Sequence, residues 1–288
     1  MSPTFYIVDV FAEQKYAGNQ LAVVLDAGAL SGDEMQAITR EFGFSETSFV
    51  LSREAVDDGF PVRIFTPGGE VPFAGHPTLG TAAVIRQELL SPEAGTVALD
   101  VAAGRIPVTF GDELWMRQIP PSFGEILDPS LVAPALGLEA GDLDGRHPVQ
   151  VVSTGLPAII IPLENLDTLK RCRPDRERYR ELTQTAGSAN LYAFCPEPHE
   201  AENDLAARMF ADDLGVPEDP ATGSAAGCLT AYLAEHNYLG DGPVDARLEQ
   251  GYEIGRSSLL YLRAEKTEED ISVEVGGKVQ MVARGELL

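Results

Sequence analysis

The chain has 288 residues, of which 21 are Lys or Arg and 45 are Asp or Glu, so its formal net charge is −24. This balance argues against a nucleic-acid-binding protein, which neutralises phosphates with clustered Lys and Arg, and it disfavours binding to an anionic membrane surface for the same reason. With 44% hydrophobic and 23% charged residues, the composition is typical of a globular protein, and the length predicts two domains.

The residue pattern of positions 6–66 predicts several strands and one helix. Residues 6–11 are β-branched and aromatic, as expected of a strand. A helix is expected to begin at Ser31, whose hydroxyl can cap it, because Glu34 follows at the spacing of a capping box. Residues 47–51 and 62–66 are again typical of strands.

Two strongly apolar helices are expected further along, one from 77 to about 90 and one from 220 to about 235. A helix that is hydrophobic all round is buried, so each is predicted to lie at the centre of a curved sheet. The remaining expected strands are 97–101, 105–110, 149–152, 244–248, 258–263, 271–275 and 278–283. Between the last two, Gly276-Gly277 is interpreted as a two-residue hairpin turn.

The cysteines and the N-terminus indicate a compartment. Cys172, Cys195 and Cys228 fit no Cys-x-x-Cys spacing, which argues against a disulfide framework and favours a reducing environment. The first residues lack the basic region and apolar run of a secretory signal, and no stretch approaches the ~18 apolar residues of a membrane span. We therefore expect a cytoplasmic protein without membrane segments.

The two halves of the chain repeat each other. Residues 76–83 and 219–226 share the pattern x-Pro-x-x-Gly-Thr/Ser-Ala-Ala. Upstream of each copy lies a similar strand, at 63–65 and 208–210, and further upstream a strand, a helix and a strand recur in the same order. Because several elements recur together, we interpret the chain as two homologous domains that face one another.

The repeated motif is a helix start in both copies. His76-Pro77 and Asp219-Pro220 place a polar residue at the expected N-cap and a proline at the first helical position, where its missing N–H has no cost. The simpler interpretation is two ordinary helix starts. The alternative is a site for a small acid, because a helix N-terminus presents free N–H groups and about half a positive charge, and facing domains would bring both starts to one cleft.

Glu46 is the candidate acid/base group. It follows the first helix and opens a strand, a place where a Glu is more often a surface residue. Its counterpart in the second half is Asn190, so the carboxylate occurs in one half only, as expected of a single catalytic group. No His or Cys spacing of a metal site, no nucleotide-binding glycine motif and no nucleophile elbow is present.

Four segments in this order carry a resemblance to a known family: residues 18–24, 45–50, 65–80 and 218–225. Together they resemble the PhzF family of phenazine-biosynthesis-like isomerases, and they span nearly the whole chain. The segment at 255–258 reads Gly-Arg-Ser-Ser where Gly-Arg-Pro-Ser is expected, which concerns the local loop shape more than the chemistry.

The resemblance implies an α+β fold like that of diaminopimelate epimerase. Two pseudo-symmetric domains would each wrap a curved β-sheet around a central helix, with the active site between them. We place the domains at 1–118 and 119–288, with the last strand, 278–288, as a candidate completion of the first domain. The resemblance further implies that the enzyme is a homodimer and uses no cofactor and no metal.

The resemblance also assigns the site residues. Glu46 matches the glutamate that moves a proton along the substrate, while His76, Asp219 and Ser224 match the substrate-holding residues, with the backbone of Gly75 beside them. The implied function is a cofactor-independent isomerase that moves a proton on a small, cyclic or aromatic-like carboxylic acid. To act as both base and acid, a Glu would need its ordinary pKa of ~4.3 raised towards roughly 6–7 by a dry cleft.

Two other functions stay open. One is an epimerase or racemase of a small amino or hydroxy acid; related epimerases use a pair of cysteines at the two motifs, and neither motif here contains one, since Cys228 lies four residues past Ser224. The other is a protein that binds a small acid without turnover. In every case the expected partner is a small anionic metabolite.

Overall fold

The computed structural model describes residues 2–91, 93–187, 189–212 and 216–288. Two compact units make up the fold: unit 1 comprises the chain up to Arg117 together with Gly276–Leu288, and unit 2 comprises Gln118–Val275. None of the described helices is long and apolar enough to cross a membrane.

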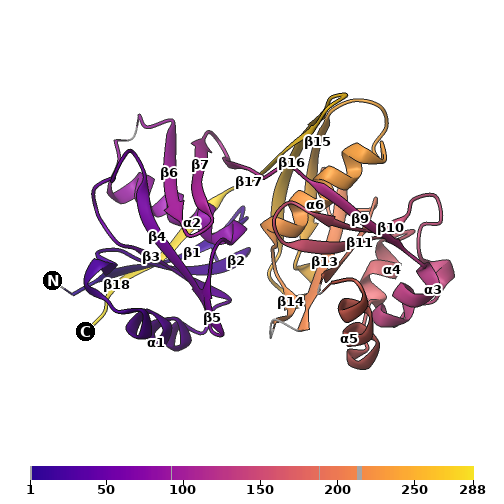
Figure 1. Ribbon diagram of the computed structural model, residues 1–288, viewed down its shortest axis with the longest axis horizontal. Helices are drawn as coiled ribbons and strands as arrows, with labels where there is room; N and C mark the ends of the chain where they lie inside the picture. Colours follow the sequence, from indigo (N-terminus) through magenta and orange to yellow (C-terminus); the bar gives the residue numbers. More distant parts are fainter. Residues whose placement is uncertain (1, 92, 188, 213–215) are drawn as a thin grey trace. The chain divides into compact units, whose positions relative to one another are not determined.

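The described residues of unit 1 form a mixed sheet, two α-helices and one short 3-10 helix (Figure 1). In chain order its elements are β1 (Thr4–Val10), β2 (Asn19–Val24), η1 (Ala27–Ala29), α1 (Gly32–Phe42), β3 (Glu46–Val50), β4 (Phe60–Thr66), β5 (Gly69–Val71), α2 (Gly75–Glu88), β6 (Thr96–Val101), β7 (Gly104–Phe110), β8 (Leu114–Arg117) and β18 (Val279–Glu286). The expected capping box of α1 is confirmed, because the Ser31 side chain accepts from the Glu34 N–H and the Glu34 side chain accepts from the Ser31 N–H.

Unit 2 repeats this plan with additional short helices. Its elements are β9 (Ser122–Leu127), α3 (Pro129–Val132), η2 (Ala133–Leu136), η3 (Ala140–Asp142), β10 (Val149–Ser153), β11 (Pro157–Pro162), α4 (Leu166–Arg171), α5 (Arg176–Thr185), β12 (Asn190–Cys195), β13 (Leu205–Ala211), β14 (Val216–Asp219), α6 (Gly223–Glu235), β15 (Val244–Gln250), η5 (Tyr252–Ile254) and β16 (Ser258–Lys266). From there β17 (Ile271–Gly277) leads the chain back to unit 1.

The strand pairings are the same in both units. In unit 1 the antiparallel pairs are β1–β2, β3–β4, β4–β5 and β6–β7. The parallel pairs are β2–β3 and β4–β6. In unit 2 the equivalent pairs have the same directions. The antiparallel pairs are β10–β11, β12–β13, β13–β14 and β15–β16, and the parallel pairs are β11–β12 and β13–β15. The repeat and the α+β fold expected from the sequence are therefore confirmed.

Each sheet surrounds one central helix, α2 in unit 1 and α6 in unit 2 (Figure 1). Ten residues of α2 and eleven of α6 are buried, as predicted from their small and apolar side chains. Gly80 shows how closely α2 approaches its sheet, because a Cβ built there would lie 2.5 Å from Leu21 and 2.8 Å from Val10. A side chain at this position would push the helix off β1 and β2.

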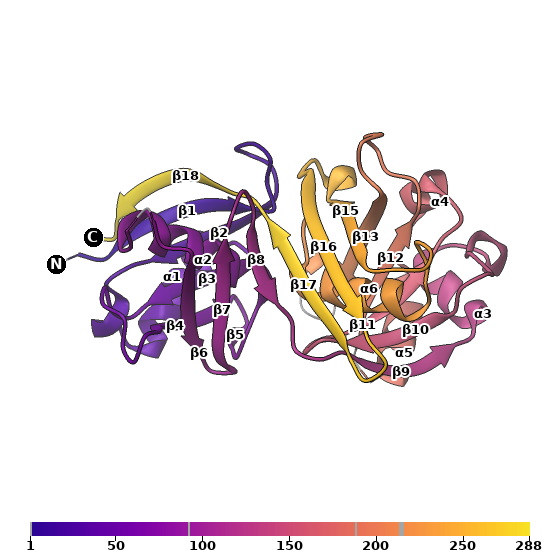
Figure 2. The same ribbon diagram turned by 90° about the horizontal axis from the view of Figure 1, so that it is seen from above.

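The hairpin expected at Gly276-Gly277 is wrong. β17 continues through Gly277, and β18 pairs with β1 (Figure 2). Neither glycine has a positive φ, as the central residues of a type I′ turn would. The glycines serve close packing instead, since a Cβ on Gly276 would lie 2.6 Å from the Trp115 ring and one on Gly277 would collide with Phe11.

Candidate active site

Glu46 and His76 come together within unit 1. Glu46 is the first residue of β3, and His76 is the second residue of α2. Oε2 of Glu46 lies 3.5 Å from Nε2 of His76, and both atoms are buried. The side chains are 18% and 6% exposed respectively, so a carboxylate and an imidazole share a mostly dry environment. This pair is the centre of the candidate site.

The imidazole of His76 is held neutral. Burial lowers its pKa from 6.5 to about 3, a shift that a hydrogen bond with the Gln20 backbone only partly opposes. Nδ2 of Asn19 lies 3.4 Å from Nδ1 of His76, so the buried Asn19 side chain contacts the ring on the side away from Glu46. An uncharged imidazole does not neutralise the neighbouring carboxylate and can exchange hydrogen bonds without carrying a positive charge.

Both central helices begin differently from the sequence prediction. The N-cap residues are Ala74 in α2 and Thr222 in α6, whereas His76 and Asp219 were expected there. His76 lies in the first turn of α2 and precedes Pro77. The backbone N–H of His76 has no intrahelical partner at this position. Asp219 ends β14 three residues before Thr222, because the turn between them is held by side chains of unit 2 rather than by helical bonds.

The starts of the two central helices carry no side-chain cap. By contrast, the other α-helices of the described chain, α1, α3, α4 and α5, are each capped by a side chain: Ser31, Asp128, Asn165 and Asp175. N–H groups in the first turns of α2 and α6 are therefore left for another acceptor. A carboxylate is a suitable one, because it also meets the positive end of the helix dipole.

Asp219 and Ser224 lie close together in the sequence at the start of α6 in unit 2. The Asp219 carboxylate accepts a short hydrogen bond from the Thr222 hydroxyl through Oδ2. Ser224 occupies the first turn of α6, half-buried, and its backbone oxygen accepts a hydrogen bond of 3.4 Å from Thr154 Oγ1. Within unit 2 the two predicted residues are thus placed at one open helix start.

The five predicted residues fall into two sets. Glu46, Gly75 and His76 gather in unit 1, and Asp219 and Ser224 gather in unit 2. Sequence reasoning did not single out Asn19, Thr222 or Gln250, although Asn19 and Thr222 lie inside the matched segments. Gln250 lies outside them, and its only sequence signal is that a glycine follows it at a strand end.

The three cysteines are buried free thiols. Burial raises the pKa of Cys172 and of Cys195 to about 12 and also raises the pKa of Cys228. The Cys228 thiol donates a hydrogen bond to the Leu156 carbonyl oxygen at 3.4 Å. Because the thiolate is the reactive form, none of the three is prepared to act as a base.

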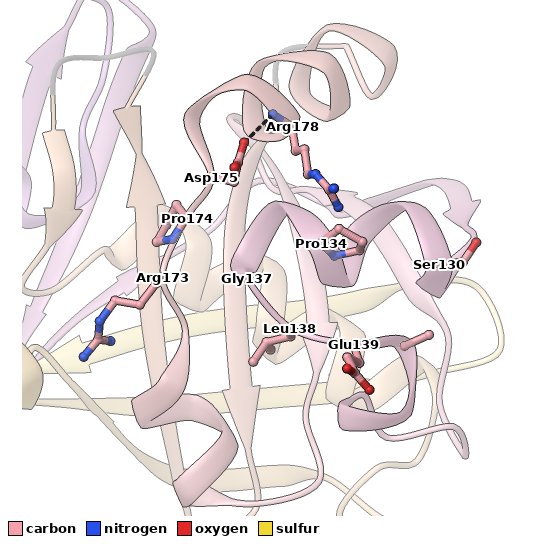
Figure 3. A pocket seen from close by; sticks show the side chains of 10 residues that line it. Ser130, Pro134, Gly137, Leu138, Glu139, Arg173, Pro174, Asp175 and Arg178 are labelled. Carbon is pink, nitrogen blue, oxygen red and sulfur yellow. Dashed lines mark hydrogen bonds between the residues drawn. The ribbon is translucent and has the colours of Figure 1, made fainter.

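A surface hollow in unit 2 lies apart from the predicted residues. It is formed by η2, the loop after it and the start of α5, and Figure 3 shows Pro134, Glu139, Arg173, Asp175 and Arg178 around it. Two arginines are balanced by two carboxylates, and Asp175 is already occupied in capping α5. The charges of this hollow favour no particular class of ligand.

Comparison with known proteins identifies a family and several similar proteins. The model of the PhzC-PhzF family of phenazine biosynthesis-like proteins matches residues 8–285. A trans-2,3-dihydro-3-hydroxyanthranilate isomerase of Pseudomonas aeruginosa is 36% identical over 292 residues, which cover 98% of each chain.

Solved structures show the same similarity. A phenazine biosynthesis protein of the PhzF family from Bacillus anthracis matches 100% of this chain and 99% of its own, with a TM-score of 0.91 and 32% identity. A predicted epimerase from Pseudomonas aeruginosa has a TM-score of 0.81 and 36% identity, with coverage of 100% and 99%. At 10% identity, a hydroxyproline epimerase from Agrobacterium vitis (99% and 90% covered) has a TM-score of 0.62, which shows the shared fold alone.

Proposed function

Because the chain belongs to the PhzC-PhzF family, we propose that it is a cofactor-independent isomerase that moves a proton between two carbons of a small carboxylic acid. The observation that carries this proposal is the Glu46–His76 pair, in which a carboxylate lies 3.5 Å from a buried, neutral imidazole. A carboxylate that no imidazolium neutralises retains its capacity to accept a proton.

The proposed reaction uses Glu46 twice. Its carboxylate removes a proton from a carbon of the substrate, and the electron pair of the broken C–H bond spreads over the conjugated acid. The protonated Glu46 then donates a proton to a second carbon, which restores the carboxylate. Because the carboxyl proton exchanges with solvent between the two steps, deuterium from D₂O can enter the substrate and the product. Neutral His76 is proposed to hydrogen-bond the oxygen on which negative charge develops, since a preorganised donor in a dry site stabilises such charge.

The other predicted residues are proposed to hold the substrate. N–H groups of the uncapped first turns, including Gly75 in α2 and Ser224 in α6, would receive its carboxylate. Asp219 would accept a hydrogen bond from an amino or hydroxyl group of the substrate. As part of the proposal, both units contribute to one site in an interdomain cleft, which lets an acid/base group from unit 1 act on a molecule anchored by unit 2.

The substrate class is proposed from a relative. The Pseudomonas enzyme is named for trans-2,3-dihydro-3-hydroxyanthranilate, a cyclic carboxylic acid with amino and hydroxyl groups. These are the kinds of group that Asp219 and the open helix starts would bind. We use this compound as the first probe within a panel of small unsaturated and amino acids.

Solvent-deuterium incorporation tests the proposal. Wild-type protein in D₂O is expected to exchange a carbon-bound hydrogen of an accepted acid, and Glu46→Gln is expected to lower the exchange rate at least about 100-fold. Glu41→Gln, at an exposed position of α1, serves as the control and should retain full exchange. If Glu46→Gln exchanges the hydrogen as fast as wild type does, Glu46 is not the acid/base group.

An epimerase is the alternative favoured by one relative, the predicted epimerase at 36% identity. Inversion needs a second base on the opposite face of the carbon, and Asp219 is the carboxylate of the matched motif. The buried thiols argue against the cysteine pair of related epimerases. Chiral analysis of the product separates the two reactions, and iodoacetamide treatment that leaves activity intact excludes a thiol mechanism. Calorimetry that finds tight binding without any exchange would instead favour a protein that only binds acids.

Assembly and compartment complete the proposal. We propose a homodimer in the cytoplasm, supported by the family resemblance and by three unpaired, buried thiols. Light scattering coupled to size-exclusion chromatography measures the assembly, and a monomer at micromolar concentration would contradict it.

A further inference from the structure

The side chain of Gln250 is the centre of a hydrogen-bonded network in unit 2. It lies at the end of β15 and is 1% exposed. Its Nε2 donates to the backbone oxygen of Asp219 at 2.7 Å and to Oγ1 of Thr222 at 3.1 Å. Its Oε1 accepts from the Thr222 backbone N–H at 3.2 Å and from the Tyr192 hydroxyl at 2.9 Å. Both donor and both acceptor positions of the amide are occupied.

The network fixes the direction of the Thr222 hydroxyl. Because Nε2 of Gln250 can only donate, Oγ1 of Thr222 accepts from it, and the hydroxyl proton is directed to Oδ2 of Asp219. The amide cannot be turned round, since its oxygen would then face the carbonyl of Asp219 and its nitrogen the Thr222 N–H. One orientation of Gln250 therefore sets one orientation of the Asp219 carboxylate.

The same hydroxyl explains the open start of α6. Thr222 is the N-cap residue, and a threonine there ordinarily accepts a hydrogen bond from an N–H of the first turn. Here no such bond forms, because the hydroxyl is engaged by Gln250 and Asp219. In unit 1 the register of β4–β6, extended by one residue beyond Pro61↔Asp100, places Val101 where the register of β13–β15 places Gln250. The N-cap residue of α2, Ala74, has no hydroxyl group.

The rest of the turn is held from the following loop. Oγ of Ser258 donates to the backbone oxygen of Pro220 at 2.8 Å. Gly251 has a φ of +80°, and a Cβ on it would lie 2.6 Å from the same oxygen. The segment after β15 thus packs directly against the turn that connects Asp219 to α6.

We propose that Gln250 and Thr222 are positioning residues that aim the Asp219 carboxylate and keep the first turn of α6 free for an anionic ligand. Neither needs to touch the ligand. The part of this inference that concerns turnover rests on the proposed function, in which Asp219 and α6 hold the substrate. Loss of Gln250 would free the Thr222 hydroxyl to rotate and cap α6, which would raise KM for a carboxylate as well as lower kcat.

Four variants test the proposal on deuterium exchange with an accepted acid. Gln250→Met and Thr222→Val, which keep the side-chain size, should each lower kcat/KM about 10- to 100-fold, as expected for a lost hydrogen bond to a charged group. Thr222→Ser keeps the hydroxyl and should stay within about 3-fold of wild type. Gln150→Met is the matched control, because Gln150 is also buried and bonds the Gly124 backbone and His236, remote in sequence from the turn.

The control separates positioning from stability. Gln150→Met should lower the melting temperature to a degree similar to Gln250→Met, because each leaves buried polar groups without their amide partner, yet retain kcat/KM within about 3-fold. A kcat/KM of Gln250→Met equal to that of the control, or a Thr222→Ser variant as impaired as Thr222→Val, would overturn the proposal.

Amide hydrogen exchange provides a readout that needs no substrate. The backbone of residues 219–226 should exchange faster in Gln250→Met than in wild type and in Gln150→Met, because Gln250 holds the Thr222 N–H and the Asp219 carbonyl directly. If the amide hydrogen-exchange rates of residues 219–226 are the same in Gln250→Met as in wild type, the inference is overturned even if turnover falls. If wild-type protein turns over no acid in the panel, the proposed function fails, and hydrogen exchange alone decides whether Gln250 holds the turn.

Discussion

Glu46 and Asn190 occupy the same place in the two repeats: each is the first residue of a strand, β3 or β12, that pairs in parallel with the strand before it, β2 or β11. Asn190 accepts a hydrogen bond from the Tyr179 hydroxyl at 3.2 Å, from the helix on the outer face, whereas Glu46 lies beside the imidazole of the central helix. One repeat has therefore developed a carboxylate–imidazole pair and the other a structural contact.

Shortening the carboxylate at this place is expected to impair exchange severely. Glu46→Asp keeps the charge but withdraws it by one methylene from the substrate, and misplacement of a reacting group by about 1 Å can cost about 100-fold in rate. Asn190→Ala, which removes the hydrogen bond from Tyr179, should leave kcat within about 2-fold and lower stability by about 1 kcal/mol. Deuterium-exchange kinetics and urea denaturation measure the two effects, and equal losses of kcat in both variants would contradict this asymmetry.

A second pair of matched residues differs in burial. Arg63 pairs with Glu70 and Arg208 with Glu218, and each guanidinium also lies over a phenylalanine ring of its own strand. Arg208 is 5% exposed and additionally donates to the carbonyl oxygens of Leu169 and Cys172, at 3.0 Å each, whereas Arg63 is 33% exposed.

We expect this difference to appear in stability. Arg208→Met leaves a carboxylate and two carbonyl groups without their buried donor and should lower the free energy of unfolding by about 3–5 kcal/mol. Arg63→Met should cost no more than about 1 kcal/mol, the usual worth of an exposed ion pair. Urea denaturation followed by far-UV circular dichroism compares the two variants, and a similar midpoint shift in both would contradict the expectation.

Features set by neighbouring residues were predictable from the sequence. The capping box of Ser31 and Glu34 depends on residues three apart and formed as expected. The burial of α2 and α6 follows from their small and apolar side chains, and the repeated motif correctly indicated a repeated fold. These predictions succeeded because each depends on local sequence or on composition.

Features set by distant contacts were not predictable. Asp219 appeared to be an N-cap because it precedes a proline, but Gln250, which lies 31 positions along the chain, holds the turn extended and moves the helix start to Gly223. Gly276 appeared to mark a hairpin because the closeness of Trp115 cannot be read from the sequence. In both cases a local rule was overridden by one tertiary contact.

The buried imidazole makes stability depend on pH. The pKa of His76 is lowered from 6.5 to about 3 in the folded protein, so between these values the unfolded chain binds a proton at this position that the folded chain does not. The contribution of His76 to stability is therefore fully present above pH 6.5 and is lost as the pH falls towards 3. Its slope is at most about 1.4 kcal/mol per pH unit.

Comparison with His76→Gln isolates this contribution. The difference in unfolding free energy between wild type and variant should shrink as the pH is lowered from 7 to 5, because only the wild type loses the His76 term. Fluorescence of Trp115, which lies in unit 1 with His76, monitors urea denaturation at each pH. A difference that stays constant over this range would contradict a pKa near 3 for the buried ring.

Alanine at Gly276 should be costly, although this glycine has an ordinary backbone conformation. A Cβ there would lie 2.6 Å from the Trp115 ring, so Gly276→Ala is expected to destabilise the protein by about 1–3 kcal/mol through overpacking. Gly68→Ala is the matched control, because its nearest neighbour, Thr66 Oγ1, is 3.6 Å away and its φ is not positive; it should be neutral within about 0.5 kcal/mol. In a Trp115→Leu background, Gly276→Ala should lower the free energy of unfolding less than it does in the wild-type background. Urea midpoints of the single and double variants measure this coupling, and strictly additive changes would show that Trp115 is not what excludes the side chain.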